Sequence, residues 1–133
     1  METQFDSRLV KGIEEFNQGL YFECHETLEE IWLEDHGEDR QFYQGIIQIA
    51  AGYFKSEQGV LRGAIKLMRS GLEKLMAYPP THLGVEVDSF VHGVKENLRE
   101  IEIAYQNKGL HPELRVPHLS LKSGDTLQPR SKL

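Results

Sequence analysis

The chain has 133 residues, 39% of them hydrophobic, and a formal net charge of −6 at pH 7. A chain of this length and apolar content can bury the core of one domain without support from disulfides. Its negative charge excludes a nucleic acid as the expected partner, because binding to the phosphate backbone needs a basic surface.

The single cysteine and the apolar runs indicate the compartment. Cys24 has no second cysteine with which to form an internal disulfide, and this fits a reducing environment. The longest apolar run, residues 46–54, contains Gln48 and Gly52 and is too short to cross a bilayer. The amino terminus shows no apolar signal segment. We therefore predict a cytoplasmic protein with no membrane partner.

Apolar residues recur at helical spacing in five segments, and this predicts an all-α fold. The expected helices cover residues 6–18, 21–35, 40–55, 60–78 and 86–107. Asp6 is the expected N-cap of the first helix, Gly19 ends it, and Pro79 with Pro80 ends the fourth.

A weak internal repeat relates the first two helices to the next two. The matched residues, each forty positions apart, are Gly19 with Gly59, Tyr21 with Leu61, Cys24 with Ala64, Leu28 with Met68, and Trp32 with Leu72. A glycine at the turn, followed by a large and then a small residue, lets two helices approach closely, as in tetratricopeptide hairpins. We predict a compact bundle of two similar helical hairpins plus a C-terminal helix. A tetratricopeptide-like peptide-binding scaffold is a further alternative.

The last predicted helix carries a regular apolar seam. Its members are Val87, Val91, Val94, Leu98, Ile101 and Tyr105. Such a seam packs lengthwise on the bundle or on a second copy of the chain, so we predict a homodimer through residues 87–105. Pro112 and Pro117 exclude a further helix, and residues 116–121 are expected to lie extended against the domain. The predicted domain spans residues 1–108, and residues 109–133 form an extended or partly disordered tail.

The candidate site lies where the second and third predicted helices meet. At 100° per residue, His25 falls on the apolar face of its helix, Glu29 lies one turn later at the edge of that face, and Glu26 points to solvent. The third helix carries a narrow polar strip made of Arg40, Gln44, Gln48, Ala51 and Lys55. We predict a buried polar cluster that hydrogen-bonds the two helices, because buried polar groups need partners. Its members are His25, Glu29 and Trp32 with Gln44 and Gln48.

The same residues also permit a ligand site. His25 and Glu29 are one turn apart, as two ligands of a divalent metal or two contacts to a metabolite would be. The stretch His25-Glu26-Thr27-Leu28-Glu29 resembles the zinc peptidase helix, except that Glu29 replaces the second histidine. A small hydrolase using His25 and Glu29 is thus an alternative, although its base, Glu26, would face solvent. Lys55 is a candidate contact for an anion.

The outer side of the second helix is strongly acidic. Residues 23–39 include eight acidic side chains and no basic one. A run of charge is most often a solvated surface. Its functional alternative is an interaction face for another protein.

Three motifs resemble a known family. They are Phe16-Asn17-x-Gly19, His25-Glu26-x-Leu28-Glu29-x-x-Trp32, and Arg40-x-Phe42-Tyr43-Gln44-Gly45-x-x-Gln48. Over about residues 16–98 the chain resembles an uncharacterised bacterial and plastid-lineage family, the domain of unknown function 309. The resemblance implies a small all-helical bundle and brings no reaction, substrate or cofactor. It marks His25, Glu26, Glu29, Trp32, Arg40, Gln44, Gly45 and Gln48 as family positions without assigned roles.

One departure from the family bears on metal binding. Members often have a histidine where this chain has Lys55 and an asparagine where it has Val60. If that histidine completes a metal site with His25 and Glu29, this chain has lost a ligand. Taken together, these observations lead us to expect a binding or interaction module with no demonstrated catalysis. The alternative is a metal- or metabolite-binding protein or small hydrolase that uses His25 and Glu29.

Overall fold

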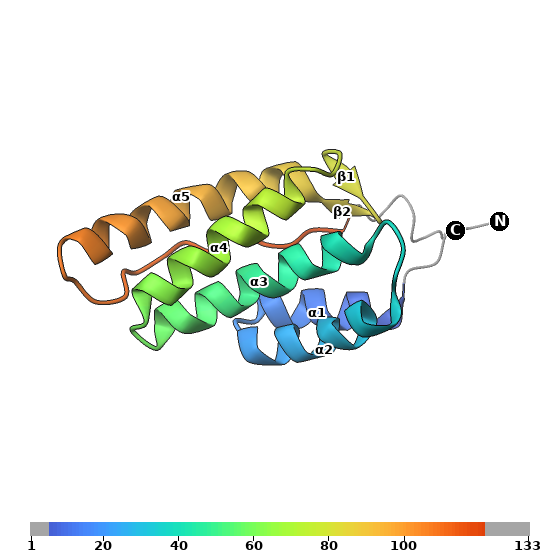
Figure 1. Cartoon of the computed structure of the whole chain (residues 1–133), viewed down its shortest axis with the longest axis horizontal. Helices are drawn as coiled ribbons and strands as arrows, with labels where there is room; N and C mark the ends of the chain where they lie inside the picture. The colour runs from blue at the N-terminus through green and yellow to red at the C-terminus, as the bar shows by residue number, and fades with distance from the viewer. Residues whose placement is uncertain (1–5, 122–133) are drawn as a thin grey trace.

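The computed structural model describes residues 6–121, which form a bundle of five helices (Figure 1). The helices are α1 (Ser7–Asn17), α2 (Tyr21–Glu34), α3 (Arg40–Glu57), α4 (Leu61–Leu75) and α5 (Val87–Gln106). A two-stranded antiparallel hairpin of β1 (Thr81–His82) and β2 (Val85–Glu86) connects α4 to α5. The predicted all-α class is confirmed. Residues 122–133 of the predicted extended or partly disordered tail lie outside the described residues.

The two helical hairpins close through the same turn. Gly19 has φ 80° and Gly59 has φ 82°, a left-handed conformation that L side chains rarely adopt. Past each glycine, the next backbone N–H donates to a carbonyl five residues back: Leu20 N to Glu15 O and Val60 N to Lys55 O, both 2.9 Å. This bond closes the C-terminus of a helix around a glycine. The prediction of two similar hairpins is confirmed.

Glycines also let α3 and α4 pack closely. A Cβ on Gly71 would lie 2.7 Å from the carbonyl oxygen of Gly45, and one on Gly45 would lie 3.1 Å from that of Gly71. A Cβ on Gly52 would meet the Met68 side chain at 2.4 Å. Backbones at this distance leave no room for a side chain, so only glycine fits at these positions.

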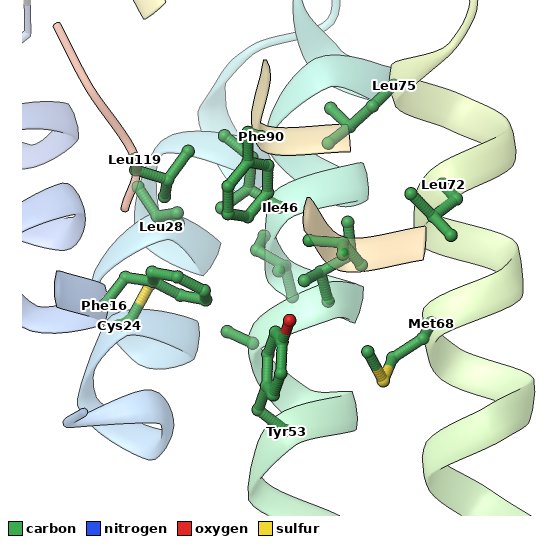
Figure 2. Packing of buried hydrophobic residues seen from close by; sticks show 14 of the residues in the cluster. Phe16, Cys24, Leu28, Ile46, Tyr53, Met68, Leu72, Leu75, Phe90 and Leu119 are labelled. Atoms are coloured by element: carbon green, nitrogen blue, oxygen red, sulfur yellow. The ribbon is translucent and has the colours of Figure 1, made fainter. Parts of the chain in front are cut away.

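Aromatic rings from four helices meet in the core. The Phe16 ring lies edge-on to Tyr21 at 5.2 Å and to Phe90 at 5.3 Å, measured between ring centroids. Tyr53 stacks on Tyr21 and donates its hydroxyl hydrogen to Asn97 Oδ1 at 2.6 Å. Figure 2 shows Phe16, Tyr53 and Phe90 among the buried side chains that join the hairpins to α5.

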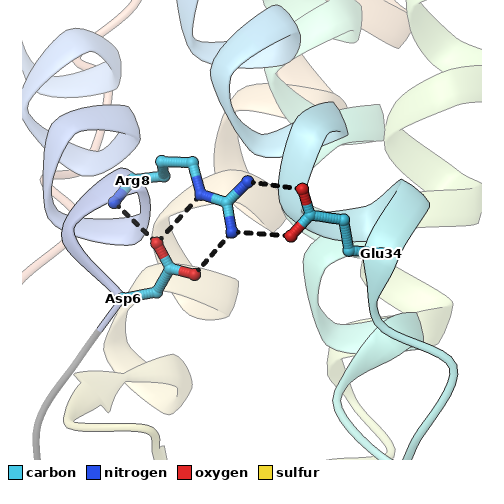
Figure 3. Close-up of polar contacts among 3 residues, drawn as sticks. All are labelled: Asp6, Arg8 and Glu34. Atoms are coloured by element: carbon cyan, nitrogen blue, oxygen red, sulfur yellow. Dashed lines mark hydrogen bonds and ion pairs between the residues drawn. The ribbon is translucent and has the colours of Figure 1, made fainter.

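Arg8 joins the start of α1 to the end of α2 (Figure 3). Its guanidinium lies 2.9 Å from both an Asp6 and a Glu34 carboxylate oxygen. Asp6 also accepts from the backbone N–H of Arg8 at 2.9 Å, so the predicted N-cap is confirmed. The hydrogen bonds from Arg8 lower the pKa of both carboxyl groups.

The segment after α5 returns along the bundle without forming a helix, as expected (Figure 1). His111 Nδ1 lies 2.6 Å from Ser56 Oγ, Leu119 is buried in the core, and Leu121 forms a bridge with Val85. Whether a domain boundary falls at residue 108 stays a prediction.

The apolar seam of α5 faces the bundle. All of its residues from Val87 to Ile101 are buried, whereas Tyr105 is 46% exposed. The homodimer through residues 87–105 stays a prediction. No helix within residues 6–121 is long and apolar enough to span a membrane.

Candidate functional site

His25 and Glu29 lie on α2 beside α3, at the border between core and solvent. The buried centre of α2 is formed by Cys24, Leu28 and Ile31, each less than 5% exposed. The His25 side chain is 29% exposed and that of Glu29 is 45% exposed. His25 Nε2 lies 4.0 Å from Glu29 Oε2, one helical turn away. The pair is therefore open to solvent on one side.

This exposure differs from the predicted buried polar cluster that hydrogen-bonds the two helices. His25 Nδ1 and Gln48 Oε1 are buried atoms, yet neither has a hydrogen-bond partner among the residues that the structure describes. No hydrogen bond within residues 6–121 joins the His25 or Glu29 side chain to Gln44 or Gln48. The physical reason is the position of His25, which lies one residue past the buried Cys24 and thus at the edge of the apolar stripe.

Trp32 is held by Arg40 and not by the glutamines. The Arg40 guanidinium lies over the Trp32 ring, 4.0 Å from its centroid. The same guanidinium donates to the carbonyl oxygens of Trp32 at 2.7 Å and Asp35 at 3.0 Å. These are carbonyls at the C-terminus of α2, where a helix leaves acceptors unpaired. Arg40, the first residue of α3, therefore fixes the turn between the two helices.

The remaining predicted residues are spread along the same border. Gln44 and Gln48 are half-buried on α3, whereas Glu26 on α2 and Lys55 near the end of α3 are exposed. We call His25, Glu29, Gln44 and Gln48 the polar row. Arg40 and Trp32 close one end of it.

An exposed aromatic residue that the sequence analysis did not select lies beside the row. The Phe22 ring is 5.9 Å from the His25 ring and 5.5 Å from the Phe54 ring, and the residue is 45% exposed. Its position three residues before His25 on a helix was the available signal. The polar row therefore has an apolar border, formed by Phe22, at the end that lies nearest the hairpin turns.

A second polar contact was also missed. His82 Nε2 on β1 lies 2.7 Å from Asp39 Oδ1, just before α3. The His82 ring packs against Phe42 and Tyr78, with centroids 4.9 and 4.6 Å away. This cluster ties the β-hairpin to the turn between α2 and α3. The two partners lie 43 positions apart, so spacing along the sequence could not reveal them.

The described residues contain no group of three or more histidine, cysteine or acidic side chains placed to hold one metal ion. His25 and Glu29 alone could supply two ligands. Any other ligands would come from solvent or from a bound molecule.

The fold and the row define a class: a small helical bundle with a partly exposed polar strip between its second and third helices. The model of the family described as domain of unknown function (DUF309) matches residues 9–67. The predicted resemblance to this family is confirmed over that region, which runs from α1 into α4. The match ends before residue 98, where the motifs had suggested its limit.

Part of the chain is also similar to a known bacterial protein. The chain is 38% identical over 74 residues to the uncharacterized protein YpuF of Bacillus subtilis (strain 168). The aligned part covers 55% of this chain and 41% of YpuF, so it spans less than half of that relative. Neither the family description nor the name of the relative states an activity.

Proposed function

We propose that this chain is a binding module, without catalysis of its own, that takes a polar group of its ligand at the polar row. The supporting observation is the pair of unpartnered buried atoms, His25 Nδ1 and Gln48 Oε1. A buried polar group without a partner costs about 1–3 kcal/mol. If a bound ligand supplied a hydrogen-bond partner to each side chain after a small rotation, binding would recover part of this free energy. The Glu29 carboxylate is exposed, so a ligand can reach it without such a rotation.

A divalent cation is a second candidate ligand. His25 Nε2 and Glu29 Oε2 are 4.0 Å apart, and ligands bound to one zinc ion each lie about 2.0–2.2 Å from it. A small side-chain rotation would therefore bring both atoms to one ion. The hydrolase alternative has weaker support, because Glu26, its expected base, is an exposed residue on α2.

We also propose a cytoplasmic location. Cys24 is free and fully buried, so it forms no disulfide within the described chain. This supports a reducing compartment. A reporter fusion active only in the cytoplasm would test it, and export of the fusion would contradict it.

The ligand proposal can be tested by NMR of the His25 imidazole. The probes are acetate, acetamide, inorganic phosphate and Zn²⁺, each titrated to 10 mM or to saturation. We expect acetate, acetamide or phosphate to shift the His25 resonances saturably, and this shift to be lost in Gln48→Ala. Glu26→Ala, an exposed change one residue from His25, is the matched control and should behave as wild type.

The outcomes separate the two ligands. Saturable uptake of zinc, manganese or iron by the wild type, lost in His25→Ala and Glu29→Ala, would support the metal. Equal uptake by wild type and His25→Ala would remove it. The proposal of a polar-group ligand fails if acetate, acetamide and phosphate all leave His25 unshifted, or if the shifts that they cause persist in Gln48→Ala.

A further inference from the structure

An open groove runs between α4 and α5, on the side of α4 away from the polar row. Its central part is a cavity of about 700 Å³ whose floor includes Leu72, Met76 and Leu98. The groove continues past Ile65 and Tyr105 at one end and past Val91 and Pro79 at the other. Met76 is 56% exposed, so the floor offers apolar surface to a partner.

The central cavity is lined by three basic residues, Lys66, Arg69 and Lys95, and by one acidic residue, Glu73, although the whole chain carries a net charge of −6. Lys66 and Lys95 stand on opposite sides of the central cavity, and both are exposed. Neither makes an ion pair with any residue in 6–121. Arg69, by contrast, is already paired with Glu102. Two uncommitted cations above an apolar floor favour an acidic, amphipathic occupant.

The outer face of α2 has that character. Phe22 and Leu33 are 45% and 62% exposed, and Glu26 and Glu30 are exposed between them. At 100° per residue these four positions fall within about 80° of one another, so they form one ridge. We call these four residues the α2 ridge.

The spacing of the ridge matches that of the groove. Phe22 and Leu33 are eleven positions apart, or about 16 Å along a helix. Ile65 at one end of the groove and Met76, which lines both the central cavity and the other end, are also eleven positions apart. The ridge can therefore place an apolar side chain at each end while its carboxylates lie between the lysines.

We propose that the α2 ridge of one copy of this chain docks in the α4–α5 groove of a second copy. The two surfaces belong to different helices, with α3 between them (Figure 1). In a pair of copies, one copy still has a free ridge and the other still has a free groove. Further copies can therefore add, and the association is head-to-tail. This differs from a two-fold dimer through residues 87–105, which would stop at two copies. The inference does not depend on a ligand at the polar row.

Charge reversal on each surface tests the proposal. The groove variant combines Lys66→Glu with Lys95→Glu, and the ridge variant combines Glu26→Lys with Glu30→Lys. In sedimentation velocity, we expect the wild-type mass to rise past a dimer with concentration, and to fall when NaCl is added because salt screens exposed charges. Each variant alone should be monomeric, with its association weakened at least tenfold.

Mixing the two variants gives the sharpest result. One variant keeps an intact ridge and the other an intact groove, so an equimolar mixture should form a 1:1 complex and nothing larger. Reversal of two lysines outside the groove, Lys11→Glu with Lys108→Glu, is the control and should leave wild-type association unchanged. Circular dichroism checks that each variant folds. If the groove variant does not fold, the combination of Lys66→Gln with Lys95→Gln takes its place.

Three outcomes would overturn the proposal. One is a wild-type protein that stays monomeric at 1 mM, which would leave the groove to a different partner. Another is association that survives both charge reversals. The third is a mixture of the two variants in which no 1:1 complex forms although the wild type associates.

Discussion

Asn17, the last residue of α1, holds the backbone of Leu119 through two hydrogen bonds across 102 positions of sequence. The Asn17 side-chain N–H donates to the carbonyl oxygen of Leu119 at 3.0 Å, and its Oδ1 accepts from the Leu119 N–H at 2.8 Å. The amide thus pairs with the chain as a neighbouring strand would. It fixes the returning segment where Leu119 enters the core at 2% exposure.

Replacing Asn17 with alanine should loosen this attachment. Both hydrogen bonds disappear, and the half-buried N–H and C=O of Leu119 lose their partner, so the free energy of unfolding should fall by about 1–3 kcal/mol. Urea denaturation measures the change. Asn107→Ala, at an exposed position after α5, is the control. An equal effect at both positions would show that the Asn17 bonds contribute nothing to stability.

Gly71→Ala should destabilise the protein even though alanine favours helices. The new Cβ would lie 2.7 Å from Gly45 O and from Ile49 Cγ1, and relieving this overlap costs about 1–3 kcal/mol. The propensity gain of about 1 kcal/mol does not offset a cost at the upper end of that range. Gly63→Ala on the same helix meets only the exposed Val60 side chain, at 3.3 Å, and should be neutral or stabilising. Equal melting temperatures for the two variants would contradict close packing of α3 on α4.

Arg40→Lys should weaken the junction between α2 and α3 although it keeps the charge. A lysine cannot lie flat on the Trp32 ring while it donates to two carbonyls, so we expect a loss of about 1–2 kcal/mol. Trp32 is the only tryptophan, and its fluorescence reports the junction directly. We expect the emission to move toward that of solvated tryptophan. Arg99→Lys, an exposed change on α5, should leave both readings as they were.

The Cys24 thiol should be inert in the folded protein. Burial raises its pKa to about 12, with a smaller contribution from the Glu15 charge, whereas a cysteine ordinarily ionises near 9. Since the folded pKa is the higher one, the stability linked to this group is complete below pH 9. It is lost as pH rises from 9 toward 12. At pH 8, reaction with an aromatic disulfide reagent should be at least a hundredfold slower than in urea, because it requires opening of the fold.

Two comparisons check the origin of that protection. Gly71→Ala should raise the reaction rate about tenfold for each 1.4 kcal/mol of stability that it removes. Rapid modification of the native wild type would instead place the thiol within reach of solvent.

Periodicity of apolar residues was sufficient to predict the five helices, because each helix buries one continuous stripe. It could not predict the hairpin at residues 81–86, whose strands have two residues each and no repeating pattern. It also placed the end of the fourth helix at residue 78, three residues beyond Leu75. The chain leaves the helix before Pro79 and Pro80, so the prolines mark the connection and not the last helical turn.

The candidate site was predicted less completely. A helical wheel gives the direction of His25 but not the width of the buried arc, and this width depends on how α1 and α3 flank α2. The helical wheel therefore placed His25 correctly at the border between α2 and α3 but overestimated how deeply its side chain is buried. Arg40 and Trp32 were selected from the family motifs, but their contact depends on the turn at residues 35–39. No local pattern describes that turn.

The shared turns at Gly19 and Gly59 raise the question of why the stack of hairpins stops at two. A hairpin that repeats after forty residues can in principle stack without end, provided that a terminal unit shields the last flank from water. Here α5 covers the flank of α4 on which a third hairpin would stack, and the returning segment ties α5 back to α1 (Figure 1). The stack of hairpins therefore ends after the second unit. A third hairpin could be added only if α5 were displaced from α4.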